Sequence, residues 1–154
     1  MTDMLRYIGC GCVVADGNGR YLMVRETKAV ARGRMAMPGG MLEPDESIVD
    51  AAVREVLEET GLTVEPTRLL GVFHCPHTSE DSYGVNFVYE ARPVAGEVTV
   101  SEEHPEVVWL TLAEIDDLHA QGMVRGGHVP IAVRRSDQNL AVPEDVVTEV
   151  SASD

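Results

Sequence analysis

Residues 54–62, REVLEETGL, contain three glutamates within five positions: Glu55, Glu58 and Glu59. In a helix, at about 100° per residue, these side chains lie within an arc of about 100°. Like charges at this spacing destabilise a helix by about 0.2–0.5 kcal/mol per pair. A divalent cation among the carboxylates would remove this cost, and oxygen ligands favour Mg²⁺, with Mn²⁺ or Ca²⁺ as alternatives. The competing interpretation is a solvated, glutamate-rich helix face.

The residues around this stretch predict a helix over residues 47–60. Ser47 is a suitable N-cap with Asp50 three positions later, which is a capping-box pattern, and Gly61 is a suitable C-terminal stop. Arg54 lies four positions before Glu58 and can pair with it. Apolar and small side chains recur at helical spacing and predict a buried stripe of Val49, Ala52, Val53, Val56 and Thr60.

Most of the remaining chain is predicted to form strands. Residues 7–16 and 21–27 are apolar runs separated by DGNG, which predicts a β-hairpin. Further strands are predicted at 68–75, 85–93 and 106–110, a short helix capped by Thr111 at 111–118, and a last helix near 130–135. The irregular alternation of strands and helices favours an α+β or mixed α/β sandwich. We expect one domain over residues 1–154, with a polar tail over about 145–154.

The composition restricts the partners. Twelve basic and 26 acidic residues give a net charge of −14, and Lys28 is the only lysine. Such a chain is repelled by nucleic acids and anionic membranes, so an anionic substrate requires a bridging cation. The acid excess is typical of proteins from salt-loving organisms, although an acidic mesophilic protein is an equal alternative. No run of 18 apolar residues and no secretory pattern at the N-terminus is present, so a cytoplasmic location is expected.

The three cysteines do not form a disulfide framework. Cys10 and Cys12 lie two apart in an apolar run and therefore face one side of a strand, where reduced core thiols are expected. Cys75 lies between His74 and His77, but a zinc site usually needs four ligands and no fourth is evident. A strand end with a turn at Pro76 is the favoured interpretation.

The sequence from Gly40 to Leu62 resembles the Nudix box of the Nudix hydrolases. The pattern requires glycine, five residues, glutamate, seven residues, Arg-Glu, an aliphatic, any residue, Glu-Glu, any residue, glycine and an aliphatic. Asp45 stands at a variable position where many members have glycine, and the flanking strands fit the family order over about residues 5–120. Every specified position is filled, by Gly40, Glu46, Arg54, Glu55, Val56, Glu58, Glu59, Gly61 and Leu62.

The resemblance implies an α/β fold: a Nudix α/β/α sandwich with a mixed sheet, in which the box forms a loop–helix–loop. It also implies that Arg54 orients the glutamates and that Glu46 braces the loop. The reaction implied is the attack of water on a diphosphate that is linked to another group. The implied Mg²⁺ ligands are Glu55, Glu58, Glu59 and the carbonyl of Gly40.

Residues outside the box are candidates for two further roles. Some relatives use a glutamate outside the box as general base, and Glu103, among Glu102, Glu103 and Glu106, has the best spacing to Trp109. Glu55 is the rival base within the box, and a solvated acidic loop is the alternative for Glu103. Arg32 and Arg34 precede the box and are candidates to bind a substrate phosphate.

These observations predict a Mg²⁺-dependent pyrophosphohydrolase, with Mn²⁺ as a substitute ion. The expected substrate is a nucleoside triphosphate or a related nucleoside diphosphate derivative, and a homodimer is common in the family. Alternatives are an ADP-ribose hydrolase, which a proline near Pro76 weakly favours, or a hydrolase of thiamine-precursor diphosphates. A non-catalytic nucleotide-sensing module is the rival class, although such proteins typically lose box glutamates.

Overall fold

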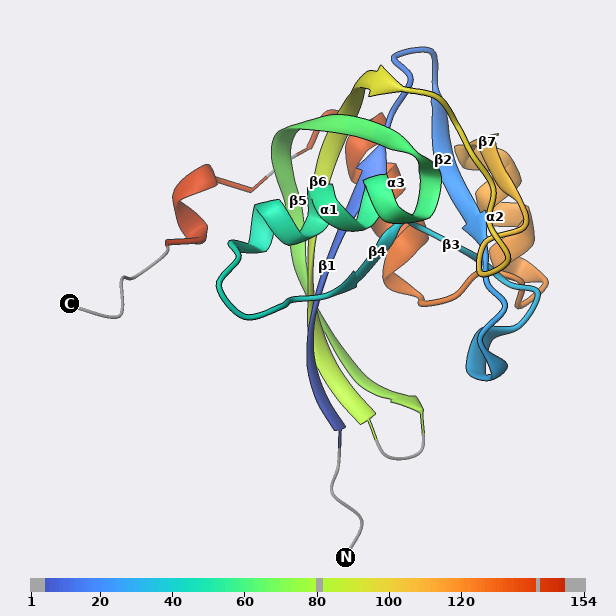
Figure 1. Ribbon diagram of the computed structural model, residues 1–154, viewed down its shortest axis with the longest axis horizontal. Helices are drawn as coiled ribbons and strands as arrows, with labels where there is room; N and C mark the ends of the chain where they lie inside the picture. The colour runs from blue at the N-terminus through green and yellow to red at the C-terminus, as the bar shows by residue number, and fades with distance from the viewer. Residues whose placement is uncertain (1–4, 80–81, 141, 149–154) are drawn as a thin grey trace, which may run out of the picture.

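Two β-sheets lie between helices in the computed structural model, which describes residues 5–79, 82–140 and 142–148 (Figure 1). The side chains of residues 5, 76–79, 82 and 144 are outside this description. The strands are β1 (Leu5–Val14), β2 (Arg20–Arg25), β3 (Met35–Ala36), β4 (Gly39–Met41), β5 (Leu62–Ser79), β6 (Ser82–Gly96) and β7 (Val107–Thr111). The helices are α1 (Ile48–Thr60), α2 (Leu112–Ala120) and α3 (His128–Asp137), with 3₁₀ turns at Ala29–Ala31 and Glu144–Val146.

The first sheet is mixed and the second is antiparallel. The first has the strand order β4-β1-β6-β5, in which β1 and β6 run parallel and the other neighbours antiparallel. The second has the order β3-β2-β7. The chain thus crosses from one sheet to the other between β1 and β2, and it crosses back between β3 and β4.

The predicted hairpin between β1 and β2 is wrong. The turn itself forms, because Asp16 accepts the N–H groups of Asn18 and Arg20 and because Gly17 and Gly19 have φ of 81° and 79°. However, β1 is hydrogen-bonded to β4 and β6, and β2 to β3 and β7, so only a single bridge joins Ala15 to Tyr21.

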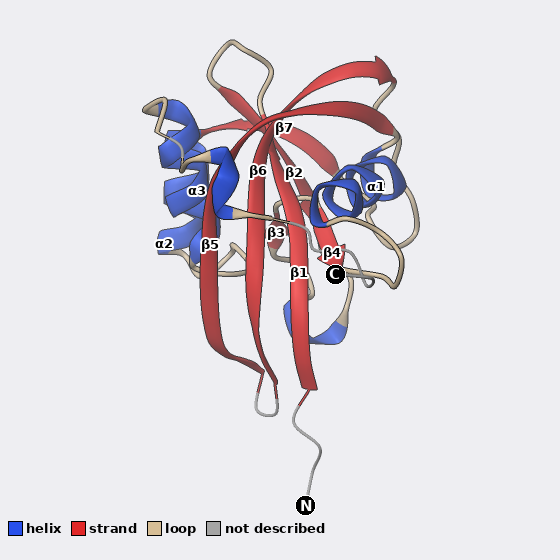
Figure 2. Cartoon of the chain, turned by 90° about the vertical axis from the view of Figure 1, so that its left-hand side faces the viewer, coloured by secondary structure: helices blue, strands red, loops and turns tan. Residues whose placement is uncertain are grey.

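Helices cover the sheets from both sides, with α1 on one side and α2 and α3 on the other (Figure 2). The alternation of side chains along β1 explains this arrangement. Cys10, Cys12 and Val14 belong to the core cluster that includes Ala52 of α1, whereas Val13 belongs to the cluster that includes α2 and α3. The expected α/β/α sandwich with a mixed sheet is therefore present.

The helices begin and end where capping residues predict. Ser47 caps α1 by accepting the N–H of Asp50, and Gly61 ends the helix with φ 78°. At the start of α1 this is the only side-chain cap bond described, so the reciprocal half of the predicted capping box is not seen. A complete capping box is instead formed by Thr111 and Glu114 at the start of α2. The last helix, α3, extends beyond the predicted 130–135 at both ends.

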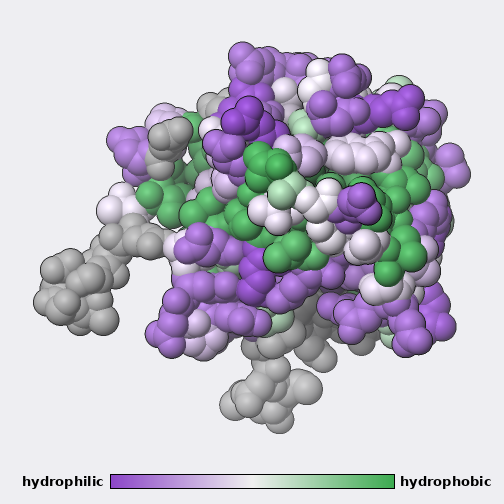
Figure 3. Space-filling model, turned by 45° about the horizontal axis from the view of Figure 1, so that its top comes forward, coloured by the Kyte–Doolittle hydropathy of each residue, from purple (hydrophilic) through white to green (hydrophobic). Residues whose placement is uncertain are grey.

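The expectations for the cysteines, for the surface and for a membrane-spanning helix can be compared with the described residues. Cys10 and Cys12 are free, buried thiols, and burial raises their pKa values to about 11 and about 12. None of the described helices is both long and apolar enough to cross a membrane. Hydrophilic side chains cover much of the face in Figure 3, as the acidic composition predicts, with apolar side chains between them. Of the predicted tail, residues 149–154 lie outside the described residues.

Candidate active site

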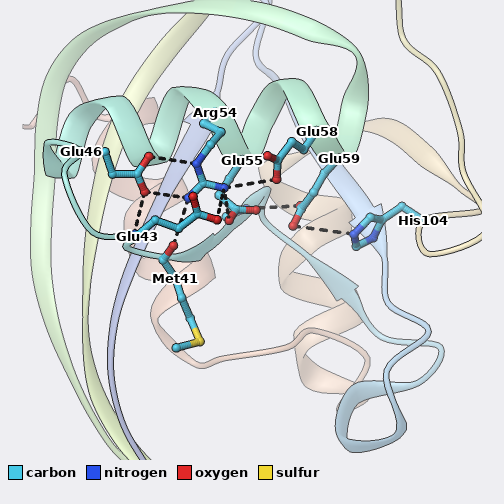
Figure 4. A network of polar contacts seen from close by, with 9 residues as sticks. Met41, Glu43, Glu46, Arg54, Glu55, Glu58, Glu59 and His104 are labelled. Carbon is cyan, nitrogen blue, oxygen red and sulfur yellow. Dashed lines mark hydrogen bonds and ion pairs between the residues drawn. The ribbon is translucent and has the colours of Figure 1, made fainter.

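Arg54 lies at the centre of a network of carboxylates that the loop before α1 and the helix itself supply (Figure 4). Its Nε and Nη2 donate to the two oxygens of Glu46 at 2.9 and 2.7 Å, a bidentate pair. Its Nη1 donates to Glu55 at 2.9 Å and to Glu58 at 3.2 Å, and its Nη2 also donates to the carbonyl of Met41 at 3.1 Å. One guanidinium therefore fixes the loop and two helix glutamates together.

Glu46 fastens the loop to this network. It accepts the backbone N–H of Glu43 at 2.8 Å as well as the two bonds from Arg54. The hydrogen bonds from Arg54, followed by that N–H, lower the pKa of Glu46 to about 2. The geometry thus matches the bracing role that the family resemblance implies for Glu46.

Glu59 and Glu55 are the two box carboxylates that lie toward the interior. The side chain of Glu59 is 11% exposed, and its Oε2 accepts the N–H of Gly39 at 3.3 Å. Burial, followed by the charge of Glu55, raises the pKa of Glu59 to about 8. Burial also raises the pKa of Glu55, although the hydrogen bond and the charge of Arg54 act to lower it.

Gly40 makes room for the carboxylate of Glu55. A Cβ on Gly40 would lie 2.3 Å from Oε1 and 2.6 Å from Oε2 of Glu55. The backbone of β4 is therefore in close contact with this carboxylate, and only glycine permits that approach. Gly40 therefore brings the backbone before the helix close to a charged group.

The pKa of Glu59 predicts that the metal-free chain loses stability as the pH rises. The folded chain holds this proton up to about pH 8, whereas the unfolded chain releases it near the ordinary value of 4.5. The folded state binds more protons between these values, so the free energy of unfolding falls across this window and levels off above it. Urea unfolding in EDTA at several pH values should show this decline.

The variant Glu59→Gln provides the control, since an amide does not titrate. The decline between pH 4.5 and pH 8 should be shallower in the variant, and the variant should be the more stable protein at pH 8. Equal slopes in both proteins would contradict the assignment of the raised pKa to Glu59. The Arg54–Glu46 pair does not interfere, because the lowered pKa of Glu46 acts below this window.

The donor set suits a hard divalent cation that binds together with its substrate. Among the described residues, no three His, Cys, Asp or Glu side chains are already grouped as a metal site. The side chain of Glu58 is 57% exposed, so the two box glutamates on the helix that are shielded from water are Glu55 and Glu59, at 14% and 11%. Two carboxylates suffice for Mg²⁺, which usually completes its shell with water and substrate phosphate. A buried Glu59 that is short of positive partners is the observation that favours such an ion.

The predicted residues outside the box lie on the surface. The side chain of Glu103 is exposed, with no hydrogen bond or ion pair described, and only its backbone carbonyl is bonded, to Thr27 Oγ1 at 2.8 Å. Arg32 and Arg34 are exposed on the connection between β2 and β3. Their roles as base and phosphate ligands stay predictions. The basic residue whose charge lowers the pKa values of both Glu55 and Glu59 is Lys28.

Two residues near the cluster were not found from the sequence. His104 is buried, and its Nε2 lies 3.7 Å from Oε1 of Glu59 (Figure 4). Glu26, directly after β2, is 5% exposed; its Oε1 lies 3.3 Å from Arg125, while its Oε2 has no hydrogen-bond partner among the described residues. The charge of Glu26 contributes to the raised pKa of Glu59. Neither residue belongs to a local motif, so spacing alone did not indicate them.

The stretch around Cys75 does not indicate zinc. The Cys75 sulfur lies 3.2 Å from Asn86 Nδ2 and 3.7 Å from His128 Nδ1, and burial lowers the pKa of His128 to about 4. His74 is exposed, and the side chain of His77 is outside the described residues. The chain continues as β5 through the predicted turn at Pro76.

Comparison with known proteins identifies the family. The family model described as the NUDIX domain matches residues 5–129. A MutT-like protein from Streptomyces ambofaciens is 34% identical over 117 residues, which cover 76% of this chain and 71% of the relative. A solved structure, a NUDIX hydrolase from Nitrosomonas europaea, matches with a TM-score of 0.81 and 26% identity over 95% of this chain and 98% of the other. The chain therefore belongs to the Nudix hydrolase family.

Several curated relatives are named for an activity, among them a nucleotide phosphatase. The protein named 8-oxo-dGDP phosphatase NUDT18 from Mus musculus is 40% identical over 91 residues, which cover 59% of this chain. The match covers 27% of that relative, so this chain spans about a quarter of its length. The family expected from the sequence is confirmed, as is its sandwich fold.

Proposed function

We propose that the chain is a Mg²⁺-dependent pyrophosphohydrolase that cleaves a phosphoanhydride bond in a nucleoside triphosphate or a related nucleoside diphosphate derivative. The observation that carries this proposal is the pair of buried carboxylates, Glu55 and Glu59, held by Arg54 and by the backbone at Gly39 and Gly40. Family membership supports hydrolysis as the reaction class. It also supports a divalent cation at this site, since Nudix hydrolases generally use divalent metals.

Different side chains bind the metal and orient its ligands. Glu55, Glu59, the more exposed Glu58 and the Gly40 carbonyl would hold Mg²⁺, which, when bound, lowers the pKa of water and neutralises phosphate oxygens. Arg54 keeps Glu55 and Glu58 in place through its bidentate anchor on Glu46. In the reaction, water forms a new P–O bond, the anhydride P–O bond breaks, and the leaving phosphate group takes the electron pair of that bond.

The proton of the attacking water requires an acceptor. Glu55 is a candidate within the carboxylate pair, and burial raises its pKa, which makes it a stronger base. Glu103 remains the second candidate, because its exposed side chain is free of described partners and its backbone carbonyl is held by Thr27 Oγ1. Substitution of each by glutamine should give unequal losses if only one of them is the base.

The substrate class follows from charge and from the relatives. A net charge of −14 favours a small anionic substrate bridged by a cation over a nucleic acid. Lys28, Arg32 and Arg34 are the basic residues on the connection that leads to β3 and are the candidate phosphate contacts. The activity in the name of the NUDT18 relative makes oxidised and normal guanine nucleoside diphosphates the first additions to a screen of triphosphates, ADP-ribose and thiamine-precursor diphosphates.

Chelation tests the proposal. We expect hydrolysis of at least one of these substrates to vanish in EDTA and to return with Mg²⁺ in excess, because repulsion between carboxylates and phosphate is then replaced by attraction. The product from a triphosphate should be a monophosphate and pyrophosphate, resolved by ion-exchange chromatography. Turnover that is insensitive to EDTA would overturn the mechanism, and release of single orthophosphate would indicate terminal phosphate removal.

A binding module that senses a nucleotide is the second candidate. All box glutamates are present and Arg54 holds three of them in position, which favours an enzyme over a sensor. Tight nucleotide binding without turnover in Mg²⁺ would support the sensor.

A further inference from the structure

The carboxylate of Glu59 is held from two sides by separate parts of the chain. Its Oε2 accepts the N–H of Gly39 at the start of β4, and its Oε1 faces the imidazole of His104 in the β6–β7 connection. The side chains of Glu59 and His104 are 11% and 6% exposed, so water has little access between them. His104 thus limits the rotation of a carboxylate that Arg54 does not contact in the described structure.

The ring of His104 has a fixed orientation. Its Nδ1 lies 3.3 Å from the carbonyl oxygen of Arg25, which only accepts hydrogen bonds, so Nδ1 carries a hydrogen. This bond turns the Nε2 edge toward Glu59, 3.7 Å from its Oε1, as Figure 4 shows. Because Nδ1 already carries a hydrogen, Nε2 attracts the Glu59 carboxylate when the ring is protonated and both nitrogens carry hydrogen. In metal sites, a backbone carbonyl that accepts from one ring nitrogen of a histidine commonly fixes the orientation of the whole ring.

The backbone on both sides of His104 is held as well. The N–H of His104 donates to Ser101 Oγ at 3.1 Å, and the N–H of Ser101 donates back to the His104 carbonyl at 3.0 Å. Thr27 Oγ1 binds the carbonyl of Glu103, and the N–H of Arg25 binds the carbonyl of Glu106 at 2.9 Å. The imidazole is therefore presented by a connection that is fastened to the end of β2.

We infer that His104 is a positioning residue that holds the Glu59 carboxylate in the orientation needed to bind the divalent cation. This inference rests on the proposed function. His104 acts through Glu59 and contacts neither substrate nor the reacting atoms. It is a role outside the Nudix box, supplied by the connection that also carries Glu103.

Two polar variants separate this role from support of the loop. His104→Asn keeps an amide near the position of Nδ1 and can still bind the Arg25 carbonyl, but it does not reach Glu59. His104→Gln extends its amide toward the position of Nε2 and can donate to Glu59. The affinity for Mn²⁺ in the absence of substrate is measured by calorimetry and by electron paramagnetic resonance, together with kcat, KM and the melting temperature.

We expect His104→Asn to weaken Mn²⁺ binding by about 10–100-fold, the usual loss when a residue that supports a metal ligand is removed. His104→Gln should recover most of the Mn²⁺ affinity. At limiting metal, kcat should fall in proportion to that affinity. At saturating metal, KM for the substrate should change little. His119→Leu, on the exposed face of α2, is the control and should match the unmodified protein.

The outcomes distinguish the two proposals. Unchanged Mn²⁺ affinity in His104→Asn, or equal losses in the Asn and Gln variants, would overturn the positioning role while leaving the proposed function intact. Failure of the unmodified protein to bind Mn²⁺ or Mg²⁺, with or without nucleotide, would overturn the proposed function and the positioning role with it.

Discussion

Glu59→Gln should lower turnover by about 10²-fold or more while the fold is kept, because the amide has lost the charge that binds the cation. The amide can still accept the N–H of Gly39, so the local geometry does not require the carboxylate. Its removal also relieves the cost of burying a charge and the repulsion from Glu55, which together raise the pKa of the carboxylate to about 8. The variant should therefore be less active and, at pH 8 without metal, more stable.

Opposite changes in activity and stability distinguish a lost ligand from a damaged fold. Turnover is measured at saturating substrate over a range of Mg²⁺ concentrations, and stability by urea unfolding in EDTA. Glu97→Gln, an exposed carboxylate on the connection after β6, is the matched control and should change neither quantity. Near-normal turnover of Glu59→Gln at ordinary Mg²⁺ concentrations would remove Glu59 from the metal site.

The parts of the site that are local in sequence could be predicted. Helical periodicity placed Glu55, Glu58 and Glu59 on one arc, and the i, i+4 spacing gave the contact between Arg54 and Glu58. Ser47 and Gly61 marked the ends of α1 through their own cap chemistry. Each of these features is determined by residues within a few positions of one another, so one sequence suffices to find them.

The parts that depend on the pairing of distant strands could not be predicted. The residues DGNG predict the turn correctly. They carry no information on which strands pair, and β1 and β2 belong to different sheets. Likewise, His104 reaches Glu59 only because β2 pairs with β7 and brings the preceding connection to the end of β2. In the stretch SEEHPEV the sequence points to a glutamate, whereas the buried side chain is that of His104. Glu26 was missed for the same reason, since nothing in its neighbours marks a buried carboxylate.

Gly40→Ala should lower turnover by about 10²-fold with a small loss of stability. The added Cβ would overlap the carboxylate of Glu55, at 2.3 Å from Oε1 and 2.4 Å from the carboxyl carbon. The three nearest atoms all belong to the end of that flexible side chain, so the carboxylate moves and the backbone does not. The free energy of unfolding should fall by about 1 kcal/mol, the lower limit for an added methyl group in a packed site. A displacement of about 1 Å in a catalytic group is sufficient for the expected loss of rate.

A matched substitution and a double variant show whether the loss passes through Glu55. Gly127→Ala is the control, because a Cβ there has no neighbour within 4 Å and its φ of −67° suits any residue. In the background of Glu55→Gln, Gly40→Ala should cost much less than 10²-fold, since the carboxylate that it displaces is already absent; contacting residues are expected to be non-additive in this way. Losses that multiply in the double variant would show that Gly40 acts on turnover by a route other than Glu55. A Gly40→Ala enzyme with normal turnover would show that close contact between β4 and this carboxylate is not needed for the reaction.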